Sequence, residues 1–503
     1  MSSTLTSPPS LSPSSDRAPE ARSGLEPWTP AELPAPPTPK GLGWAAVVGP
    51  GVIVLGLSIG SGEFLLGPAV FVRHGLALLW VTGVAVFFQT VFNTELMRYT
   101  LATGEPALTG FMRTRPSSTG WAWFYTLLFF FQSGWPAWAA NAAGAIFFLT
   151  LGRLATGEEA RIVYWIGVAT FIGCVTVLLF GRRIERTLEI LNWVLVTCIL
   201  GGFLLLAVMF VPGSTWAAGL AGFFAYDGVT GGFTLLPPGA DWVLLAALVG
   251  YTGAGGVSNL MLSNWARDKG YGMSQRAGYI PAAVGGHKVA LVHTGFRLLP
   301  TSDWRERWRG WWRIVRADQW VVFFCGATLG MLLPAILYVT FIPRGTDIRG
   351  LGIAAALAQG IGAASGPFLA GLVAFLGAWI LFKTQLDILD GMVRCITDML
   401  WTGSRRVRSW RGGDVRAVYY GVLAAVVGWG IIALGLAQPI ILLQIGANVA
   451  GVVFIISSMH LLYINTKLLP KELHPPMWRR VALVAMALFY AAFAVMSLVA
   501  LRG

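Results

Sequence analysis

The chain has 503 residues, of which 55% are hydrophobic and only 12% are charged, and its formal net charge is +13. Several apolar runs reach the roughly 20 residues that a helix needs to cross a bilayer, so this composition excludes an ordinary soluble protein. The positive charge falls in loops between these runs, whereas nucleic-acid binding requires a basic folded face. We therefore predict an all-α polytopic membrane protein that binds no nucleic acid.

Residues 1–40 precede the first apolar run and are rich in Ser, Pro and Ala. They show no apolar period, and such a segment cannot bury enough surface to fold. We predict a disordered cytoplasmic tail over residues 1–40, without a signal peptide, and a transmembrane transporter domain over residues 41–503.

Hydropathy places about eleven membrane spans in that domain. Their approximate bounds are 44–71, 76–97, 121–151, 162–180, 188–211, 242–264, 320–342, 367–400, 415–434, 439–464 and 477–501. The loops on one side of this arrangement carry 25 Lys and Arg residues, and those on the other side carry 6. Because cytoplasmic loops are enriched in Lys and Arg, we predict a cytoplasmic N-terminus and a C-terminus outside the cell.

Two of the spans contain glycine-rich stretches: residues 56–63 in the first and residues 253–259 in the sixth. Irregular backbone inside a membrane is tolerated where it lines a cavity, and a matching pair in two halves of a chain marks the central site of many transporters. We predict a five-plus-five inverted repeat with one extra helix. Helices one and six should be broken near Gly60 and Gly255 and should face each other across a central cavity.

These glycines have a second interpretation, which the sequence leaves open, because small residues also let helices pack closely. The functional interpretation is favoured by the polar residues at the breaks, since a packing face does not need them. The predicted ion- or substrate-binding residues are Gly60, Ser61, Glu63, Gly255, Ser258 and Asn259, with Glu63 and Asn259 as metal ligands.

Glu63 is the most informative of these residues, because an ionisable group near mid-bilayer costs roughly 2.5–3.5 kcal/mol on insertion scales and normally faces a cavity or a partner. Three roles remain open for it. It could coordinate a cation, carry a coupling proton, or accept hydrogen bonds from the backbone N–H groups that a helix break leaves unpaired.

The eighth span carries four charged residues, Lys383, Asp387, Asp390 and Arg394, at helical spacings of four, three and four. They therefore form a ladder on one helix face. With Glu63, the two aspartates are candidates for a proton path, and the alternative is a neutral, self-paired structural seam.

The loop over residues 265–319 is long for a simple connection between spans. Residues 304–313 interleave Trp and Arg, which is typical of an amphipathic helix lying on an anionic membrane surface. We predict that this loop is cytoplasmic and contacts anionic lipids.

Several short motifs resemble those of one transporter family. Residues 49–51 and 59–64 are similar to the first helix of the Nramp-type (natural-resistance-associated macrophage protein) divalent metal transporters, and further matches lie at residues 102–104 and 181–185. The resemblance covers the chain from about Trp44 to its end. It implies a leucine-transporter-type fold and proton-coupled uptake of transition-metal ions.

The sequence departs from this family where the chemistry lies. Gly60 stands in place of the family's metal-binding Asp, Glu63 stands in place of its Asn, and residues 257–259 replace its Met-Pro-His. Oxygen ligands without a thioether favour hard ions such as magnesium, calcium or manganese. We therefore predict a divergent member of this type whose scaffold is retained while its ion preference differs.

The predicted function is secondary active transport of a metal cation, expected to be divalent and proton-coupled, by alternating access. A transporter of an amino acid or another small organic solute on the same scaffold is the alternative. No nucleotide-binding loop, zinc-protease motif or nucleophile elbow is present in the sequence, so we expect no enzyme activity. The four cysteines lie in apolar runs without metal-ligand spacing, and no cofactor is expected beside the transported cation.

Overall fold

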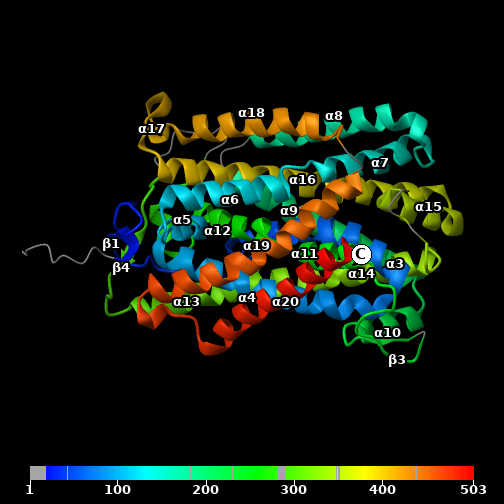
Figure 1. Ribbon diagram of the computed structural model, residues 1–503, viewed down its shortest axis with the longest axis horizontal. Coiled ribbons are helices and arrows are strands. Elements are labelled where there is room, and N and C mark those ends of the chain that lie inside the picture. Colours follow the sequence, from blue (N-terminus) through cyan, green and yellow to red (C-terminus); the bar gives the residue numbers. More distant parts are fainter. Residues whose placement is uncertain are drawn as a thin grey trace, which may run out of the picture.

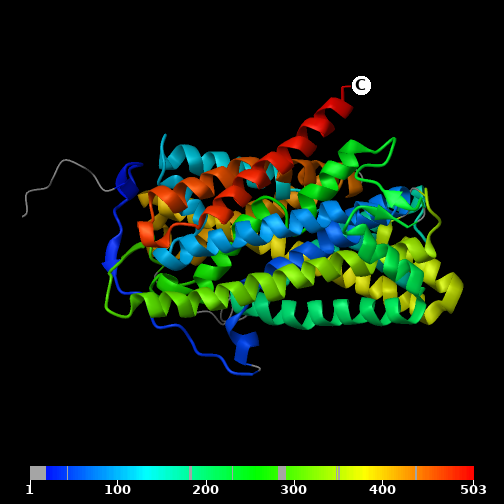
Figure 2. The same ribbon diagram turned by 90° about the horizontal axis from the view of Figure 1, so that it is seen from below.

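The computed structural model describes residues 19–41, 43–180, 184–228, 230–280, 291–346, 348, 352–436 and 439–502. Its long helices run roughly along one axis, with short helices and strands gathered at the two ends of that axis (Figure 1). The N-terminal strand and the C-terminus lie toward opposite ends (Figures 1 and 2).

Nine helices among the described residues are long and apolar enough to cross a membrane. They contain α2 (Pro50–Ser58), η2 (Ile59–Leu66) and α3 (Gly67–His74); η3 (Leu76–Leu78) and α4 (Leu79–Thr103); η4 (Gly157–Glu159) and α8 (Ala160–Leu179); α9 (Ile184–Phe210); α13 (Trp304–Arg316), η6 (Ala317–Phe324) and α14 (Cys325–Phe341); α16 (Pro367–Gly403); α18 (Val415–Ala433); α19 (Pro439–Lys467); and α20 (Met477–Ala500). The predicted third and sixth spans each consist of two shorter helices, α6 (Ser118–Ser133) with α7 (Ala137–Leu151) and α11 (Trp242–Tyr251) with α12 (Val257–Lys269). The predicted all-α polytopic membrane fold is confirmed.

The remaining elements are short and lie before the first span or between later ones. They are η1 (Pro19–Ala21), β1 (Thr29–Ala31), α1 (Gly43–Val47), α5 (Ala107–Met112), α10 (Gly213–Gly222), β2 (Tyr226–Asp227), β3 (Gly232–Phe233), η5 (Gly272–Arg276), β4 (Phe296–Leu298), α15 (Ile353–Ser365), α17 (Arg405–Arg408), η7 (Trp410–Gly412) and η8 (Lys471–Leu473). Strand β1 pairs with β4 in parallel, and β2 pairs with β3 antiparallel.

The first span departs from α-helical geometry at the predicted place, but its backbone does not unwind there. Segment η2 is π-helical, and the amide of Gly67 donates to the carbonyl of Gly62. Such wide turns inside α-helices are frequent at functional sites. The expectation of unwound backbone near Gly60 is therefore corrected, because the extra residue is taken up by a wider helical turn.

The sixth span is broken as predicted. Helix α11 ends at Tyr251 and α12 begins at Val257. Gly253, Gly255 and Gly256 between them have φ angles of 75°, 87° and 52°. These lie in the left-handed region that glycine adopts readily and other residues avoid, so the glycines are needed for the break itself.

The third span contains an interruption that the sequence analysis did not predict. Helices α6 and α7 are separated by residues 134–136, and the indole of Trp429 donates to the carbonyl of Gly134 over 2.9 Å. Pro136 supplies no backbone N–H, which favours ending a helix at this point. The Gly-Trp-Pro sequence was the available signal for the interruption.

Helix α13 carries the Trp- and Arg-rich stretch and is not a separate helix in a loop. It continues through η6 into α14 as one rod of 38 residues, drawn in yellow-green in Figure 2. The guanidinium groups of Arg98 and Arg479 lie over the ring of Trp312, at 4.3 and 4.9 Å from its centroid. This face of α13 therefore packs on protein.

The N-terminal segment is packed against the domain from residue 19 onward. Besides the pairing of β1 with β4, the side chains of Trp28 and Leu33 are buried. The guanidinium of Arg113 donates to the carbonyls of Glu20 and Glu26, each over 2.8 Å. The prediction of disorder is therefore wrong for residues 19–40, because distant parts of the chain supply the missing partners. Residues 1–18 lie outside the described residues.

Replacing Trp28 with alanine is expected to destabilise the protein by about 3 kcal/mol, since it removes a large buried aromatic side chain. Trp28 is 6% exposed, whereas Trp410, the matched control for the same change, is 46% exposed. Thermal unfolding in detergent measures both variants. Equal melting temperatures for Trp28→Ala and the wild type would show that the segment is not part of the folded unit.

Candidate functional site

Glu63 lies in η2 and is fully buried. Its Oε1 accepts hydrogen bonds from the hydroxyl of Ser58 and from the amide of Gly253, the latter over 3.1 Å. Its Oε2 has no hydrogen-bond partner among the described residues. Glu63 thus joins the π-helical turn of the first span to the break of the sixth, and one of its oxygens is left available.

The two irregular segments contact each other directly. A methyl group added at Gly62 would overlap the carbonyl of Tyr251, and one added at Gly60 would overlap the side chain of Thr384 on α16. The absence of side chains at these glycines therefore permits close approach of three spans. Helices one and six meet in this structure and do not face each other across a cavity, so that expectation is corrected.

Two glutamines from other spans hold the break of the sixth span. Gln132 on α6 donates to the carbonyl of Gly255 over 2.8 Å and accepts from the amide of Val257 over 2.9 Å. Gln89 on α4 donates to the carbonyl of Thr252, and its Oε1 faces Gly253 without a hydrogen-bond partner among the described residues. Sequence reasoning missed both residues, although an amide inside an apolar span was a usable signal.

Replacing Gln132 with leucine is expected to lower the free energy of unfolding by about 2 kcal/mol or more. The change leaves the buried amide of Val257 without a partner, at a cost of roughly 1–3 kcal/mol, and it removes one of the two hydrogen bonds that the carbonyl of Gly255 accepts. The matched control is Gln359→Leu, because Gln359 is exposed on α15. Thermal unfolding of the two variants tests this. A smaller effect for Gln132→Leu than for Gln359→Leu would contradict the supporting role.

The other predicted site residues lie around the same junction, and they differ in how many hydrogen bonds they make to protein groups. Ser61 donates to the carbonyl of Leu57 over 2.9 Å and accepts from the indole of Trp138 over 3.1 Å. Ser258 is buried in the first turn of α12, where its amide donates to the carbonyl of Gly255 over 3.0 Å. The hydroxyl of Ser61 is therefore already satisfied by protein groups.

Asn259 points to α4, where its amide nitrogen donates to Oδ1 of Asn93 over 2.8 Å. Its own Oδ1 is buried and has no hydrogen-bond partner among the described residues. In the described part of the chain, no three His, Cys, Asp or Glu side chains come together as a metal-binding group. A cation at this junction would thus be held by Glu63 with amide, hydroxyl and carbonyl oxygens.

The charge ladder of α16 divides into two parts. Asp390 accepts hydrogen bonds from Arg394, from the indole of Trp265 over 3.0 Å and from the hydroxyl of Tyr419 over 2.6 Å. Asp387 lies 3.1 Å from the ammonium of Lys383 and accepts from the amide of Asn192 over 3.0 Å. Asp390 thus fits the structural seam. Asp387 has fewer hydrogen-bond partners, because its Oδ2 has none among the described residues.

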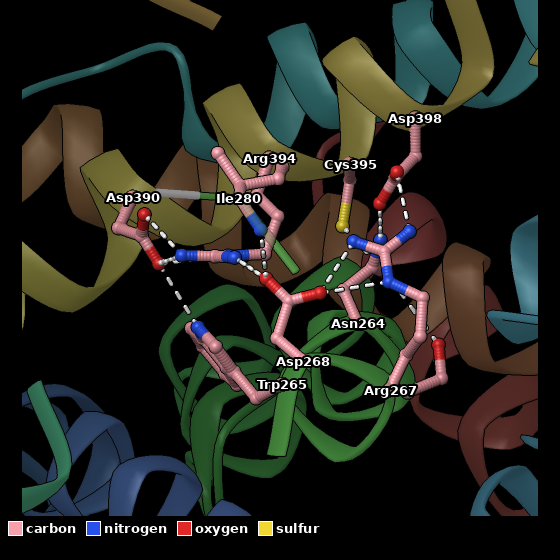
Figure 3. Close-up of polar contacts among 10 residues, drawn as sticks. Asn264, Trp265, Arg267, Asp268, Ile280, Asp390, Arg394, Cys395 and Asp398 are labelled. Atoms are coloured by element: carbon pink, nitrogen blue, oxygen red, sulfur yellow. Dashed lines mark hydrogen bonds and ion pairs between the residues drawn. The ribbon is translucent and has the colours of Figure 1, made fainter. Parts of the chain in front are cut away.

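Arg394 extends the seam to α12, the second helix of the broken sixth span (Figure 3). It also pairs with Asp268 on α12, and Arg267 beside it bonds both Asp268 and Asp398. The amide of Asn264 donates to Asp398 as well. All of these side chains are buried. The network therefore fastens α12 to α16 by two arginines and three aspartates.

Comparison with known proteins identifies the scaffold. The manganese transporter of Eremococcus coleocola, in complex with an aromatic bis-isothiourea substituted compound, has 15% sequence identity and a TM-score of 0.60, over 92% of this chain and 88% of that chain. A mutant of that transporter gives a TM-score of 0.63 at 15% identity, over 94% of this chain and 89% of that chain. No family model matches the sequence, and no curated protein matches it.

A second kind of transporter has a similar structure. Mhp1, a nucleobase-cation-symport-1 family transporter in a closed conformation with bromovinylhydantoin bound, has 12% identity and a TM-score of 0.50, over 96% of this chain and 94% of that chain. At these identities the likeness shows the fold. The leucine-transporter-type fold implied by the sequence motifs is confirmed.

Proposed function

We propose that this protein is a secondary active transporter of a metal cation and that Glu63 is its acidic ligand. The observation that carries the proposal is the fully buried Oε2 of Glu63, without a hydrogen-bond partner among the described residues. An isolated buried carboxylate is strongly disfavoured, so it either binds a cation or takes up a proton. Both events are steps of proton-coupled cation transport.

The position of Glu63 supports transport more than a purely structural role. It bridges the two irregular segments of the first and sixth spans, which is where transporters with broken helices bind their substrates. A structural cap would need only Oε1, which already accepts from Ser58 and Gly253. Oε2 is then available for a second function. The similarity to a manganese transporter agrees with a cation as the substrate.

The alternative substrate is an amino acid or another small organic solute. The likeness to Mhp1 supports this alternative only as a scaffold. A carboxylate group of such a solute would approach Glu63 as a like charge, whereas a cation would neutralise it. The geometry therefore favours the cation, and nothing in the site supports a catalysed reaction.

Coupling to protons is assigned to Glu63 itself. The other two residues of the predicted proton path, Asp387 and Asp390, are engaged by Lys383 and by Arg394. A single carboxylate that binds either a proton or a metal cation couples the two by competition. The proton must leave before the metal cation can bind, and the metal cation must leave before the proton can bind.

The orientation and the lipid contacts are proposed as the sequence predicted them, with the N-terminus in the cytoplasm and the C-terminus outside. Four arginines of α13 are exposed at spacings of four, four and three along one face: Arg305, Arg309, Arg313 and Arg316. Such a stripe beside a membrane span suits the anionic headgroups of the cytoplasmic leaflet.

Uptake into liposomes that contain the purified protein tests the proposal. We expect saturable uptake of a divalent cation and no uptake of amino acids. Because the available donors are oxygens, magnesium and manganese should compete better than cadmium, which prefers sulfur ligands. Protein-free liposomes are the control. Amino-acid uptake without cation uptake would replace the proposal by its alternative, and tight cadmium competition would contradict the oxygen-ligand site.

A further inference from the structure

A buried cluster of polar and charged side chains lies where α2, α9 and α16 meet. Lys383 on α16 is 1% exposed by its side chain, and its ammonium lies 3.1 Å from Oδ2 of Asp387. The chain end of Lys383 reaches α2 at Gly56, where an added methyl group would overlap both the ammonium and Oδ1 of Asn192. A carboxylate, an amide oxygen and an ammonium thus meet beside the first span.

The bonding in this cluster is incomplete. The ammonium of Lys383 and the carboxylate of Asp387 are in ion-pair contact, but the ammonium has no hydrogen-bond partner among the described residues. Oδ2 of Asp387 and Oδ1 of Asn192 are likewise without partners there. The amide nitrogen of Asn192 donates to Leu188 and to Oδ1 of Asp387, which turns its oxygen toward the cluster.

An ammonium has three donors and is costly to bury without acceptors for them. A lysine serving only as a structural ion pair would satisfy more of them. Lys269 is an example of such a structural lysine. Its side chain is 11% exposed, and its ammonium donates a hydrogen bond to Glu189 over 2.5 Å. The ammonium of Lys383 instead lies near the oxygens of Asp387 and Asn192 without a hydrogen bond to either. Oxygen atoms surround a bound monovalent cation in the same way.

We propose that the ammonium of Lys383 is a tethered cation that occupies a seat for a monovalent ion between α2, α9 and α16. The seat is made by Oδ2 of Asp387 and Oδ1 of Asn192, and the glycine at position 56 leaves room for the ion. The charge of Lys383 neutralises Asp387 permanently, so transport needs no sodium. Removing the ammonium leaves a negatively charged oxygen site that sodium can fill.

The seat lies close to the proposed transport site along the chain. Gly56 is two residues before Ser58, whose hydroxyl donates to Glu63, and Thr384, next to Lys383, donates to the carbonyl of Gly56 over 3.3 Å. An ion in the seat therefore fixes the first span against α16. A tethered cation holds this contact at every sodium concentration. The proposal depends on the fold and on this cluster, and not on which substrate is transported.

The test compares sodium chloride with choline chloride at equal ionic strength, using the full-length protein in detergent without substrate. The wild-type melting temperature should be the same in both salts. Lys383→Ala should be less stable than the wild type in choline, and its melting temperature should rise with sodium concentration and then saturate, as expected for binding to the folded state. The double variant Lys383→Ala with Asp387→Asn should lose this response because the seat loses its charge.

Lys269→Ala is the matched control, since it removes the lysine of another buried lysine and carboxylate pair, and it should show no saturable sodium effect. In liposomes, sodium should stimulate the uptake of Lys383→Ala and leave the wild type unchanged. A wild type stabilised by sodium would overturn the proposal. The proposal would also be overturned if sodium did not stabilise Lys383→Ala more than choline does, including the case in which this variant does not fold in either salt. If neither protein transports a cation, the proposed function fails while the stability result still decides this inference.

Discussion

Glu63→Gln is expected to reduce cation uptake by about tenfold or more while leaving the amount of folded protein unchanged. Glutamine has nearly the same shape, and its Oε1 can still accept from Ser58 and from the amide of Gly253, which hold the two irregular segments together. The change removes the negative charge at Oε2. Losing a charged partner costs about 1.5–3 kcal/mol, and 1.4 kcal/mol corresponds to a factor of ten in affinity.

Initial rates of uptake into liposomes, measured over a range of cation concentrations and at two pH values, test this expectation. Glu472→Gln is the control, because it makes the same chemical change at an exposed position. If Glu63 also carries the coupling proton, the remaining transport in the Gln variant should respond less to a pH gradient. Uptake equal to that of Glu472→Gln, with the same response to pH, would limit Glu63 to its hydrogen bonds and remove it from the transport mechanism.

The second large effect is expected for Arg394→Met, which should lower the free energy of unfolding by about 3–5 kcal/mol. Arg394 is fully buried and pairs with both Asp390 and Asp268. Methionine fills much of the same volume but leaves two carboxylates buried without their shared cation. Removing one partner of a buried ion pair is costly for this reason, even where the intact pair itself contributes little.

Thermal unfolding in detergent measures this loss, with Arg406→Met as the exposed control. Adding Asp268→Asn and Asp390→Asn to Arg394→Met should restore part of the stability, because the two charges that lost Arg394 are then removed. A thermodynamic cycle that treats the two Asn substitutions as one change separates the coupling from the individual effects. A melting temperature for Arg394→Met within the range of Arg406→Met would show that the network does not fasten α12 to α16. Full additivity of the three substitutions would show the same.

The sequence determined the membrane spans and the break of the sixth helix, because both depend on local properties. Apolar runs of sufficient length must cross the bilayer as helices, since no water is present to satisfy the backbone. Gly253, Gly255 and Gly256 adopt φ angles that other residues avoid. Sequence reasoning also identified Glu63, since a carboxylate in an apolar span needs a reason to be there.

The contacts of these residues depend on tertiary packing. One partner of Glu63 is the amide of Gly253, 190 positions further along the chain, and Gln89 and Gln132 reach the same break from two other spans. Likewise, the segment around Trp28 is ordered by β4 and Arg113, which composition could not indicate. Hydropathy and spacing report each segment by itself, whereas the bonding of a buried polar atom depends on which helices pack together, and that is a property of the whole fold.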